Sequence, residues 1–336
     1  MIQAAKNWYD TKGPNGVAIR VPLDVDVAMD PYLGLSSDEA IKNYYLENGY
    51  VVLRNLVPPA LCDRAGAAFG REVKNYDGPL YRQTTSGNPE KHRLTKHGYV
   101  ENSILNVHDL PTSRFKEFRN DSLEILAHSK IQGALKALFA EPGQLVQSMY
   151  FEGNPSTWPH QDTYYLDSEQ LGSMVAAWVA VEDIKPGAGR FYVYPGSHKI
   201  DLKKNGGDFD IAFHHERYKH FIIDVINNHG LELSAPALKK GDVLFWNAKT
   251  IHGSLSTTQD EFSRCSFTAH YIPESHRFIQ FQSRIKSFQS RMVNGMRVNY
   301  PKDQDRIRNR VIFGLETTFP RAFRTIKNTA IKVVTS

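Results

Sequence analysis

Two residues have the types and the spacing to bind one metal ion. His160 and Asp162 lie two positions apart in the segment Trp158-Pro-His160-Gln-Asp162-Thr-Tyr-Tyr165. On an extended strand such residues project from the same face, so both can reach one ion. One imidazole and one carboxylate are two of the three ligands of a 2-His-1-carboxylate site, which holds Fe(II) and leaves positions open. A co-substrate and dioxygen could bind together at those open positions.

A third ligand is expected from a histidine further along the chain. His252 follows a turn and an apolar strand that ends at Trp246, from which a histidine can project into the mouth of a barrel. Arg264 precedes another apolar segment, and a buried arginine can bind a carboxylate through two hydrogen bonds. A simpler interpretation stays open, in which His160 and Asp162 form a hydrogen-bonded pair in a loop and His252 lies in a turn.

Several other residues have two interpretations each. His97 lies in a loop-like segment and could bind an anionic substrate or be solvated. Tyr164 and Tyr165 follow Asp162 closely and could line a substrate pocket or belong to the core. His215 and His220 would lie about 140° apart on a helix, which argues against the zinc site of a metalloprotease.

Composition excludes several classes of protein. The 336 residues include only two cysteines, Cys62 and Cys265, which excludes a disulfide scaffold and a metal site built of cysteines alone. The longest uncharged apolar run, 174–181, is far shorter than the roughly 20 residues that span a bilayer. The first ten residues lack the apolar region of a secretory signal. We therefore expect a soluble, cytoplasmic protein with no membrane partner.

Basic residues are concentrated near the C-terminus. Residues 277–336 contain 13 Lys and Arg against three Asp and Glu, in a chain whose net charge is +5. Such an asymmetry can mark an anionic substrate, a partner surface or a homo-oligomer contact, or it can be a solvated helical face. No zinc-finger, helix-turn-helix or RNA-recognition pattern accompanies it, so nucleic acid is not expected as a partner.

The expected elements are leading helices followed by short strands. Capping residues and apolar spacing predict helices over 37–48, 59–74 and 123–139, with a helical insertion within 209–229. Strands are predicted at 50–54, 145–151, 174–181, 190–194, 242–246 and 263–272.

This order of elements predicts a mainly β fold with flanking helices, either an antiparallel sandwich or a barrel. One domain is expected over 36–273, with a long loop region at 77–112. Residues 1–35 are expected to form an N-terminal arm. Residues 274–336 are expected to form a basic, helical extension packed on the same domain.

Seven segments form an ordered set that points to one protein family. They are Glu47-Asn-Gly-Tyr-Val-Val-Leu-Arg54, His160-Gln-Asp162, Ala177-Trp178-Val-Ala-Val-Glu-Asp183, Val193-Tyr-Pro-Gly-Ser-His198, Gly241-Asp-Val-Leu-Phe-Trp246, His252-Gly-Ser254 and Ser263-Arg264. In this order they resemble the phytanoyl-CoA dioxygenase family of Fe(II)/2-oxoglutarate dioxygenases, over about 36–273. The resemblance implies a double-stranded β-helix, also called a jelly roll or cupin-like fold, with iron in its mouth.

The resemblance also implies roles for individual residues. The three iron ligands of the family match His160, Asp162 and His252. Arg264, helped by Ser254, would bind the far carboxylate of 2-oxoglutarate. Trp178 and Gln147 would line the pocket of this co-substrate.

The reaction that the resemblance implies uses Fe(II), 2-oxoglutarate and O2. Succinate and CO2 would be released while an unactivated C–H bond of a small molecule is hydroxylated. Asp162 favours hydroxylation, desaturation, ring closure or dealkylation over halogenation, because iron halogenases lack this carboxylate. We favour a role in natural-product biosynthesis. Two alternatives stay open: a non-catalytic jelly-roll binding protein, and a cupin-like metalloenzyme that does not use 2-oxoglutarate.

Overall fold

The largest element of the fold is an eight-stranded sheet. The computed structural model describes residues 7–83, 88–153 and 155–323. Seven strands follow one another in the order β17 (Gln289–Val293), β18 (Met296–Tyr300), β7 (Gly143–Phe151), β14 (Ser266–Pro273), β10 (Val175–Ala180), β12 (Val243–Asn247) and β3 (Tyr50–Leu53). The short strand β6 (Ile104–Leu105) also pairs with β7. Only β18 and β7 run parallel, and every other pair in the sheet is antiparallel.

A second, smaller sheet provides the other half of the barrel. Its three strands are β11 (Phe191–Val193), β13 (His252–Ser254) and β8 (Thr157–His160), all antiparallel. A further small sheet joins β16 (Arg284–Lys286), β15 (Phe278–Gln280) and β9 (Leu166–Ser168). The predicted antiparallel strands are therefore present, and the small sheet carries both histidines of the predicted metal site.

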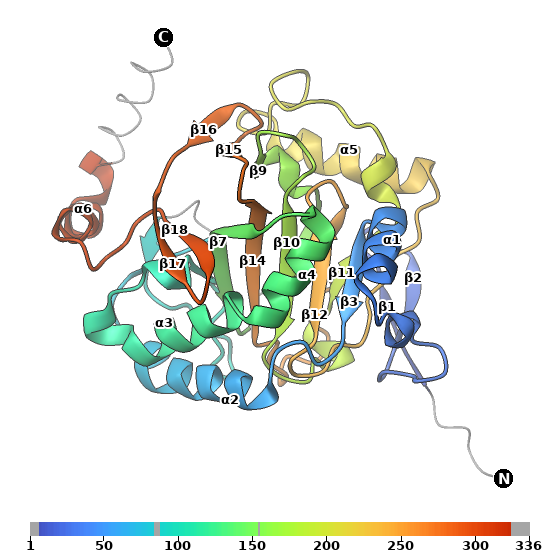
Figure 1. Ribbon diagram of the computed structural model, residues 1–336, viewed down its shortest axis with the longest axis horizontal. Helices are drawn as coiled ribbons and strands as arrows, with labels where there is room; N and C mark the ends of the chain where they lie inside the picture. Colours follow the sequence, from blue (N-terminus) through green and yellow to red (C-terminus); the bar gives the residue numbers. More distant parts are fainter. Residues whose placement is uncertain (1–6, 84–87, 154, 324–336) are drawn as a thin grey trace.

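Four helices lie against the large sheet (Figure 1). They are α1 (Asp38–Asn48), α2 (Pro59–Ala68), α3 (Thr112–Leu126) and α4 (Ser129–Phe139). The cap predicted for the first helix is present, because the Ser37 side chain accepts a hydrogen bond from the amide of Ala40. Gly49 ends this helix in the left-handed conformation, with φ of 75°.

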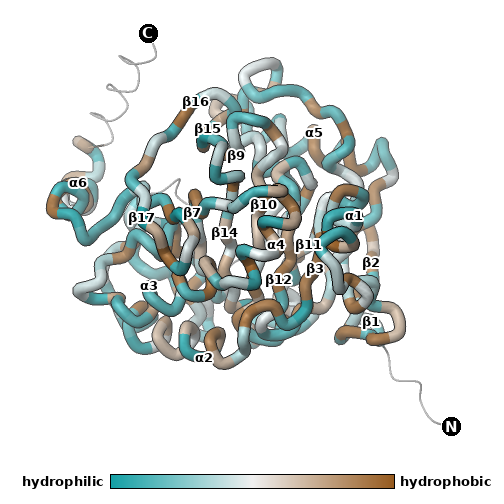
Figure 2. The backbone as a smooth tube through the Cα atoms, viewed as in Figure 1, coloured by the Kyte–Doolittle hydropathy of each residue, from teal (hydrophilic) through white to brown (hydrophobic). Residues whose placement is uncertain are grey.

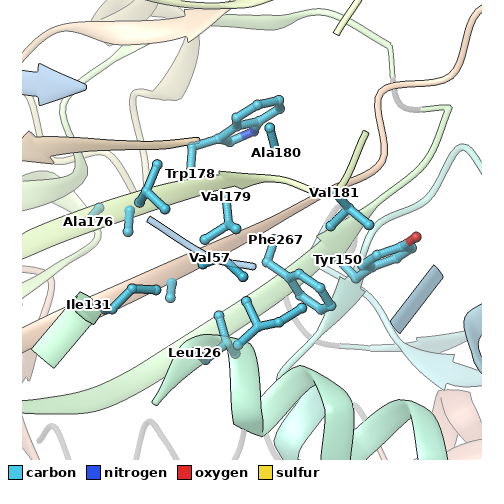
Figure 3. Close-up of a cluster of buried hydrophobic side chains, with 14 of the residues drawn as sticks. Val57, Leu126, Ile131, Tyr150, Ala176, Trp178, Val179, Ala180, Val181 and Phe267 are labelled. Carbon is cyan, nitrogen blue, oxygen red and sulfur yellow. The ribbon is translucent and has the colours of Figure 1, made fainter. Parts of the chain in front are cut away.

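The main core lies between these helices and one face of the large sheet. Phe267 and Tyr150 pack with Leu126 and Ile131 of the helices (Figure 3). Phe267 belongs to an alternating strand, since Phe267, Ala269 and Tyr271 are in this core. The intervening residues of that strand, at 266, 268 and 270, therefore project to the opposite face, toward the interior of the barrel.

A second core supports the small sheet from outside. It combines side chains of the N-terminal hairpin β1 (Trp8–Lys12) and β2 (Ala18–Pro22), of the small sheet and of α5 (His215–Asn228). Arg190 attaches the hairpin to the domain, because its guanidinium donates hydrogen bonds to the carbonyls of Pro22 and Leu23. The predicted helical insertion is thus present as α5, and the predicted arm contains a packed hairpin.

The helix predicted over 123–139 is wrong in its bounds. The structure has two helices there, and the first begins already at Thr112, directly after Pro111. The second begins anew at Ser129, where the His128 side chain accepts a hydrogen bond from the amide of Lys130. In its described residues, 77–83 and 88–112, the predicted long loop contains three two-residue strands, namely β6 and the pair β4 (Leu80–Tyr81) and β5 (Pro89–Glu90).

The helical extension predicted over 274–336 is wrong for its first part. Residues 278–300 form four strands, and the segment contains one helix within its described residues, α6 (Ile307–Thr318). The physical reason is a tight turn at Asn294 and Gly295, whose φ angles of 48° and 86° suit a two-residue hairpin between β17 and β18. This hairpin extends the large sheet beside β7.

Hydropathy follows this arrangement. Hydrophobic segments, in brown, gather in the inner strands, and hydrophilic ones dominate the outer loops (Figure 2). Within the described residues, no helix is both long enough and apolar enough to cross a membrane.

Candidate metal centre

The two histidines of the candidate metal centre form a directly opposed pair. His160 ends β8, His252 begins β13, and the two residues face each other across this antiparallel pair of strands. Opposed residues project from the same face, and the two imidazole centroids lie 4.4 Å apart. The Nδ1 atoms contact the carbonyls of Trp158 at 3.0 Å and of Thr250 at 2.9 Å. Both rings are thereby fixed with Nε2 free to bind a metal ion.

Asp162 completes the cluster from a 3-10 turn, Asp162–Tyr164, that starts one residue after β8. Gln161 between them is extended, so Asp162 returns to the face of His160. Its Oδ1 lies 3.6 Å from Nε2 of His160 and 3.5 Å from Nε2 of His252. Ligand atoms of the three residues all lie within 4.8 Å of one another.

The electrostatics of this cluster favour metal binding. Burial lowers the pKa of the His160 imidazole. Burial would raise the pKa of Asp162, but attraction to the imidazoles of His252 and His160 holds that pKa well below its usual range. An ionised carboxylate, and an imidazole such as His160 that gives up its proton readily, suit a metal site. Two imidazoles and one carboxylate fit Fe(II), as the sequence predicts.

Two contacts of Asp162 were not predicted from the sequence. Its second oxygen, Oδ2, accepts a hydrogen bond of 2.9 Å from the indole Nε1 of Trp246. Nε2 of His270 lies 3.5 Å from the same oxygen. A usable signal was the polar series Arg264, Ser266, Thr268, His270 at alternate positions of a strand that is otherwise apolar.

Gln147 and Trp178, two of the predicted co-substrate residues, lie on the inner face of the large sheet. Gln147 faces His270 in the register of β7 and β14, and therefore shares its face. Trp178 is buried on β10, and its ring stacks on Phe191. Phe191 stacks in turn on the ring of His252. Both predicted residues thus belong to the interior that contains the metal cluster.

Arg264 is buried, and one of its hydrogen-bond donors has no acceptor. Its terminal nitrogens donate to the carbonyls of Gly189 at 2.8 Å and Pro155 at 2.7 Å. Nε is buried without a partner, and within the described residues no carboxylate forms an ion pair with this guanidinium. Burial lowers the pKa of Arg264 to about 10, so the side chain is still charged at neutral pH. A buried cation without a counter-charge is the environment in which an anionic ligand would be stabilised.

Ser254 lies two residues after His252 on β13 and shares its face. Its hydroxyl accepts a hydrogen bond from the amide of Thr157 at 2.8 Å, which links β13 to β8 beside the metal cluster. The hydroxyl proton is therefore free to be donated to a ligand.

Aromatic rings from three elements surround His160. The ring of Trp158 lies 5.1 Å from that of His160, and the ring of Tyr165 lies 6.0 Å away. His215, the first residue of α5, packs edge-on against Trp158 at 5.0 Å. Its Nδ1 lies 3.5 Å from the Tyr165 hydroxyl. The inserted helix thus reaches the aromatic rings beside the metal cluster, which was not predicted from the sequence.

Two of the predicted substrate residues lie elsewhere. Tyr164 is in the second core, with its ring 4.4 Å from that of Tyr218 and its hydroxyl donating to the carbonyl of Lys203. His97 is at the surface, where Nε2 lies 3.3 Å from Asp260. Of the three predicted substrate residues, the structure brings only Tyr165 to the metal cluster.

Comparison with known proteins agrees with this geometry. The family described as phytanoyl-CoA dioxygenase (PhyH) matches residues 45–265. The chain is 26% identical over 300 residues to the peroxisomal phytanoyl-CoA dioxygenase of Bos taurus, covering 81% of this chain and 82% of that protein. It is 24% identical over 262 residues to phytanoyl-CoA dioxygenase domain-containing protein 1 of Danio rerio, covering 68% and 87%.

Solved structures with the same fold are more distant in sequence. The carbocyclase SnoK from nogalamycin biosynthesis has a TM-score of 0.52 and 19% identity, covering 72% of this chain and 86% of its own. EctD from S. alaskensis with bound Fe has a TM-score of 0.51 and 17% identity, covering 75% and 84%. The predicted double-stranded β-helix is thereby confirmed. The chain belongs to the phytanoyl-CoA dioxygenase family and is an iron- and 2-oxoglutarate-dependent dioxygenase of that family.

Proposed function

We propose that the chain hydroxylates an unactivated C–H bond of a small organic molecule in natural-product biosynthesis, with Fe(II) held by His160, Asp162 and His252. The observation that carries this proposal is the convergence of their ligand atoms within 4.8 Å. Iron bound there would supply the oxidation, by activating O2 with electrons from 2-oxoglutarate. The residues of the chain hold the ligands in place and exclude water.

Arg264 supports the use of 2-oxoglutarate at this site. Its buried Nε lacks a partner, and its charge lacks a counter-ion within the described residues. A carboxylate of the co-substrate would satisfy both needs through a charge-assisted hydrogen bond. Ser254, whose hydroxyl proton is free, could donate a second hydrogen bond on the face of His252. This demand for an anion argues against a cupin-like metalloenzyme without 2-oxoglutarate.

The aromatic side chains next to His160 support a small organic substrate. Trp158, Tyr165 and His215 come from β8, from the turn that follows it and from the inserted helix α5. Rings of this kind offer apolar contact area together with a few polar atoms. The ammonium of Lys219 lies 5.4 Å from the centre of the Trp158 ring and forms an ion pair of 2.8 Å with Glu216. A cytoplasmic location and a homo-oligomeric state stay predictions.

The first experiment is an anaerobic titration of metal-free protein with Fe(II) and then 2-oxoglutarate. We expect the weak visible charge-transfer band of an iron-chelated keto acid in the wild type and no band in His160→Ala. If a folded wild-type protein gives no band, the proposal fails and the non-catalytic binding protein is favoured. If the band forms, small molecules can be screened by their stimulation of succinate release.

A further inference from the structure

The two oxygens of the Asp162 carboxylate have different surroundings. Oδ1 faces the two imidazoles of the metal cluster at 3.5 and 3.6 Å. Oδ2 faces away from that pair and contacts Trp246 at 2.9 Å and His270 at 3.5 Å. The carboxylate is therefore in contact with possible metal ligands on one oxygen and with two further nitrogen atoms on the other.

Trp246 can act on Asp162 only as a hydrogen-bond donor. An indole nitrogen carries a proton and has no acceptor site. The ring itself is immobilised, because it is 1% exposed and packs against Phe191 at 4.7 Å and His252 at 4.9 Å. Its N–H thus directs Oδ2 of Asp162 toward the large sheet.

His270 provides the second nitrogen contact of the same oxygen. An ionised carboxylate is only an acceptor, so a close imidazole nitrogen is favourable there only when it is protonated. Nδ1 of His270 is buried without a hydrogen-bond partner. A proton on Nε2 gives this contact a donor, and Nδ1 then places no unpaired N–H in the interior.

The register of the large sheet explains why both residues reach the same oxygen. Ala176 of β10 faces Trp246 on one side and His270 on the other. Directly opposed residues share a face, so the indole and the imidazole stand on either side of a methyl group. This small side chain leaves space above the sheet in which the carboxylate of Asp162 lies between the two donors.

We infer that Trp246 and His270 are positioning residues that restrict Asp162 to binding iron through Oδ1 alone. The inference rests on the proposed metal site. With Oδ2 hydrogen-bonded to the Trp246 indole and in contact with Nε2 of His270, the carboxylate would hold a metal ion through Oδ1, which would leave positions open beside the two histidines. A carboxylate that bound through both oxygens would occupy a position needed by the keto acid or by O2.

The test measures metal and co-substrate affinity, not turnover, in Trp246→Phe, His270→Leu and His270→Gln. Trp246→Phe keeps an aromatic ring and removes the N–H. His270→Leu removes the donor, whereas His270→Gln can place an amide N–H near the position of Nε2. His108→Leu is the matched control, because His108 is fully buried, bonds to Ser148 on the other face of β7 and also has one unpartnered ring nitrogen.

Metal-free proteins are titrated with Co(II), followed by its visible absorption, and Fe(II)-loaded proteins are titrated with 2-oxoglutarate without oxygen. We expect Trp246→Phe and His270→Leu to weaken Co(II) binding by about 10- to 100-fold, as is typical when the partners of a metal ligand are removed. Binding of 2-oxoglutarate should also weaken in both variants. His270→Gln should retain more of both affinities than His270→Leu, and His108→Leu should bind both like the wild type.

Affinities in Trp246→Phe and His270→Leu equal to those of the wild type would overturn the inference. An equal loss in His108→Leu would overturn it too, because the effect would then come from general damage to the core. His160→Ala separates this failure from that of the proposed function. If the wild type binds Co(II), His160→Ala does not, and the positioning variants bind normally, the metal site stands and only the inference fails.

Discussion

At the scale of single residues, the site depends on buried polar groups that have no partner among the residues that the structure describes. Arg190 and Arg264 are both buried arginines, but they differ in this respect. The guanidinium of Arg190 donates through all three nitrogens to the carbonyls of Ile184, Pro22 and Leu23. Arg264 retains a buried Nε without a partner, so it is the arginine that is available for a ligand.

This contrast yields a prediction for co-substrate binding. Arg264→Met should weaken the binding of 2-oxoglutarate to Fe(II)-loaded protein by roughly 30- to 150-fold, since a lost charged hydrogen-bonded pair costs about 2–3 kcal/mol. Arg264→Lys should lose less, because it keeps the charge but not the two-pronged geometry. The measurement is a titration of the charge-transfer band with 2-oxoglutarate.

Arg190→Met is the matched control for Arg264→Met. It removes a buried arginine whose partners are all carbonyls, so it should lower thermal stability and leave 2-oxoglutarate affinity unchanged. Equal affinities for 2-oxoglutarate in wild type and a folded Arg264→Met would place the co-substrate elsewhere.

Residue types and spacing made His160, Asp162 and His252 a candidate set, the family resemblance favoured it over a loop pair and a turn histidine, and the structure brings the three together. His160 and Asp162 are close in the chain, and His252 stands in a recognisable segment after an apolar strand. Trp246 and His270 were missed because their role depends on which strands are neighbours. Strand β10 pairs with both β12 and β14, which brings these two residues to one oxygen. This pairing cannot be read from the amino-acid sequence.

At the scale of elements, the bounds of helices and strands were predicted correctly where a capping or turn residue was recognised in the sequence. Ser37 and Gly49 set the bounds of α1 as predicted. The start of α3 was missed because its first ten residues are mostly polar, and only Pro111 before them marks the beginning. The β17–β18 hairpin was not predicted, because the segment was interpreted as a basic helical extension. Its Asn294-Gly295 pair is nevertheless a strong signal for a hairpin turn.

The junction between α3 and the C-terminal segment contains a buried acid. Asp109 precedes α3, and its Oδ2 accepts a hydrogen bond from the amide of Lys302 while Oδ1 is buried without a partner. Burial, reinforced by the charge of Asp303, raises the pKa of Asp109 to about 8, although the charge of Arg119 opposes this. The folded protein therefore keeps this acid neutral at neutral pH.

Asp109 should make the protein less stable as the pH rises. In the unfolded chain the acid ionises near pH 4, whereas in the folded protein it keeps its proton up to about pH 8. The folded state thus binds more protons between these values, and the free energy of unfolding falls by up to about 1.4 kcal/mol per pH unit in this window. Asp109→Asn should remove this contribution.

The measurement is the free energy of unfolding of wild type and Asp109→Asn in denaturant from pH 5 to pH 8. We expect the difference between the variant and the wild type to shift in favour of the variant as the pH rises. A difference that does not change with pH would show that Asp109 is ionised in the folded state.

At the scale of the whole molecule, the order of motifs along the chain was more informative than the distribution of charge. The ordered segments between residues 47 and 264 led to the correct fold. The basic C-terminal segment was interpreted from its charge, yet its strands are partly buried. Met296, Val298 and Tyr300 of β18 belong to the main core. Charge counts do not show which side of a strand meets the sheet.

Several buried polar contacts attach this segment to the domain. Asn299 donates to Gln144 and to the carbonyl of Leu145, both on β7, at 3.0 Å. Arg119 of α3 forms an ion pair of 2.6 Å with Asp305. Because these groups are buried or partly buried, loss of one partner leaves the other unsatisfied, which is costly.

We therefore predict that the domain does not fold stably without β17 and β18. A chain ending at Pro273 would expose the edge of β7 and the apolar residues that β18 covers, and an exposed apolar edge strand promotes aggregation. A chain ending at Arg306 is the matched control, since it keeps the hairpin and Asp305 and removes α6, whose Ile307, Val311 and Leu315 are exposed.

In thermal unfolding followed by circular dichroism, the shorter chain should aggregate or lack a cooperative transition. The longer chain should unfold cooperatively, with a melting temperature lowered by a few degrees through the loss of contacts such as that of Tyr81 with Glu316. Cooperative unfolding of the shorter chain at the wild-type temperature would show that residues 274–306 are an appendage and that the domain ends where the sequence motifs end.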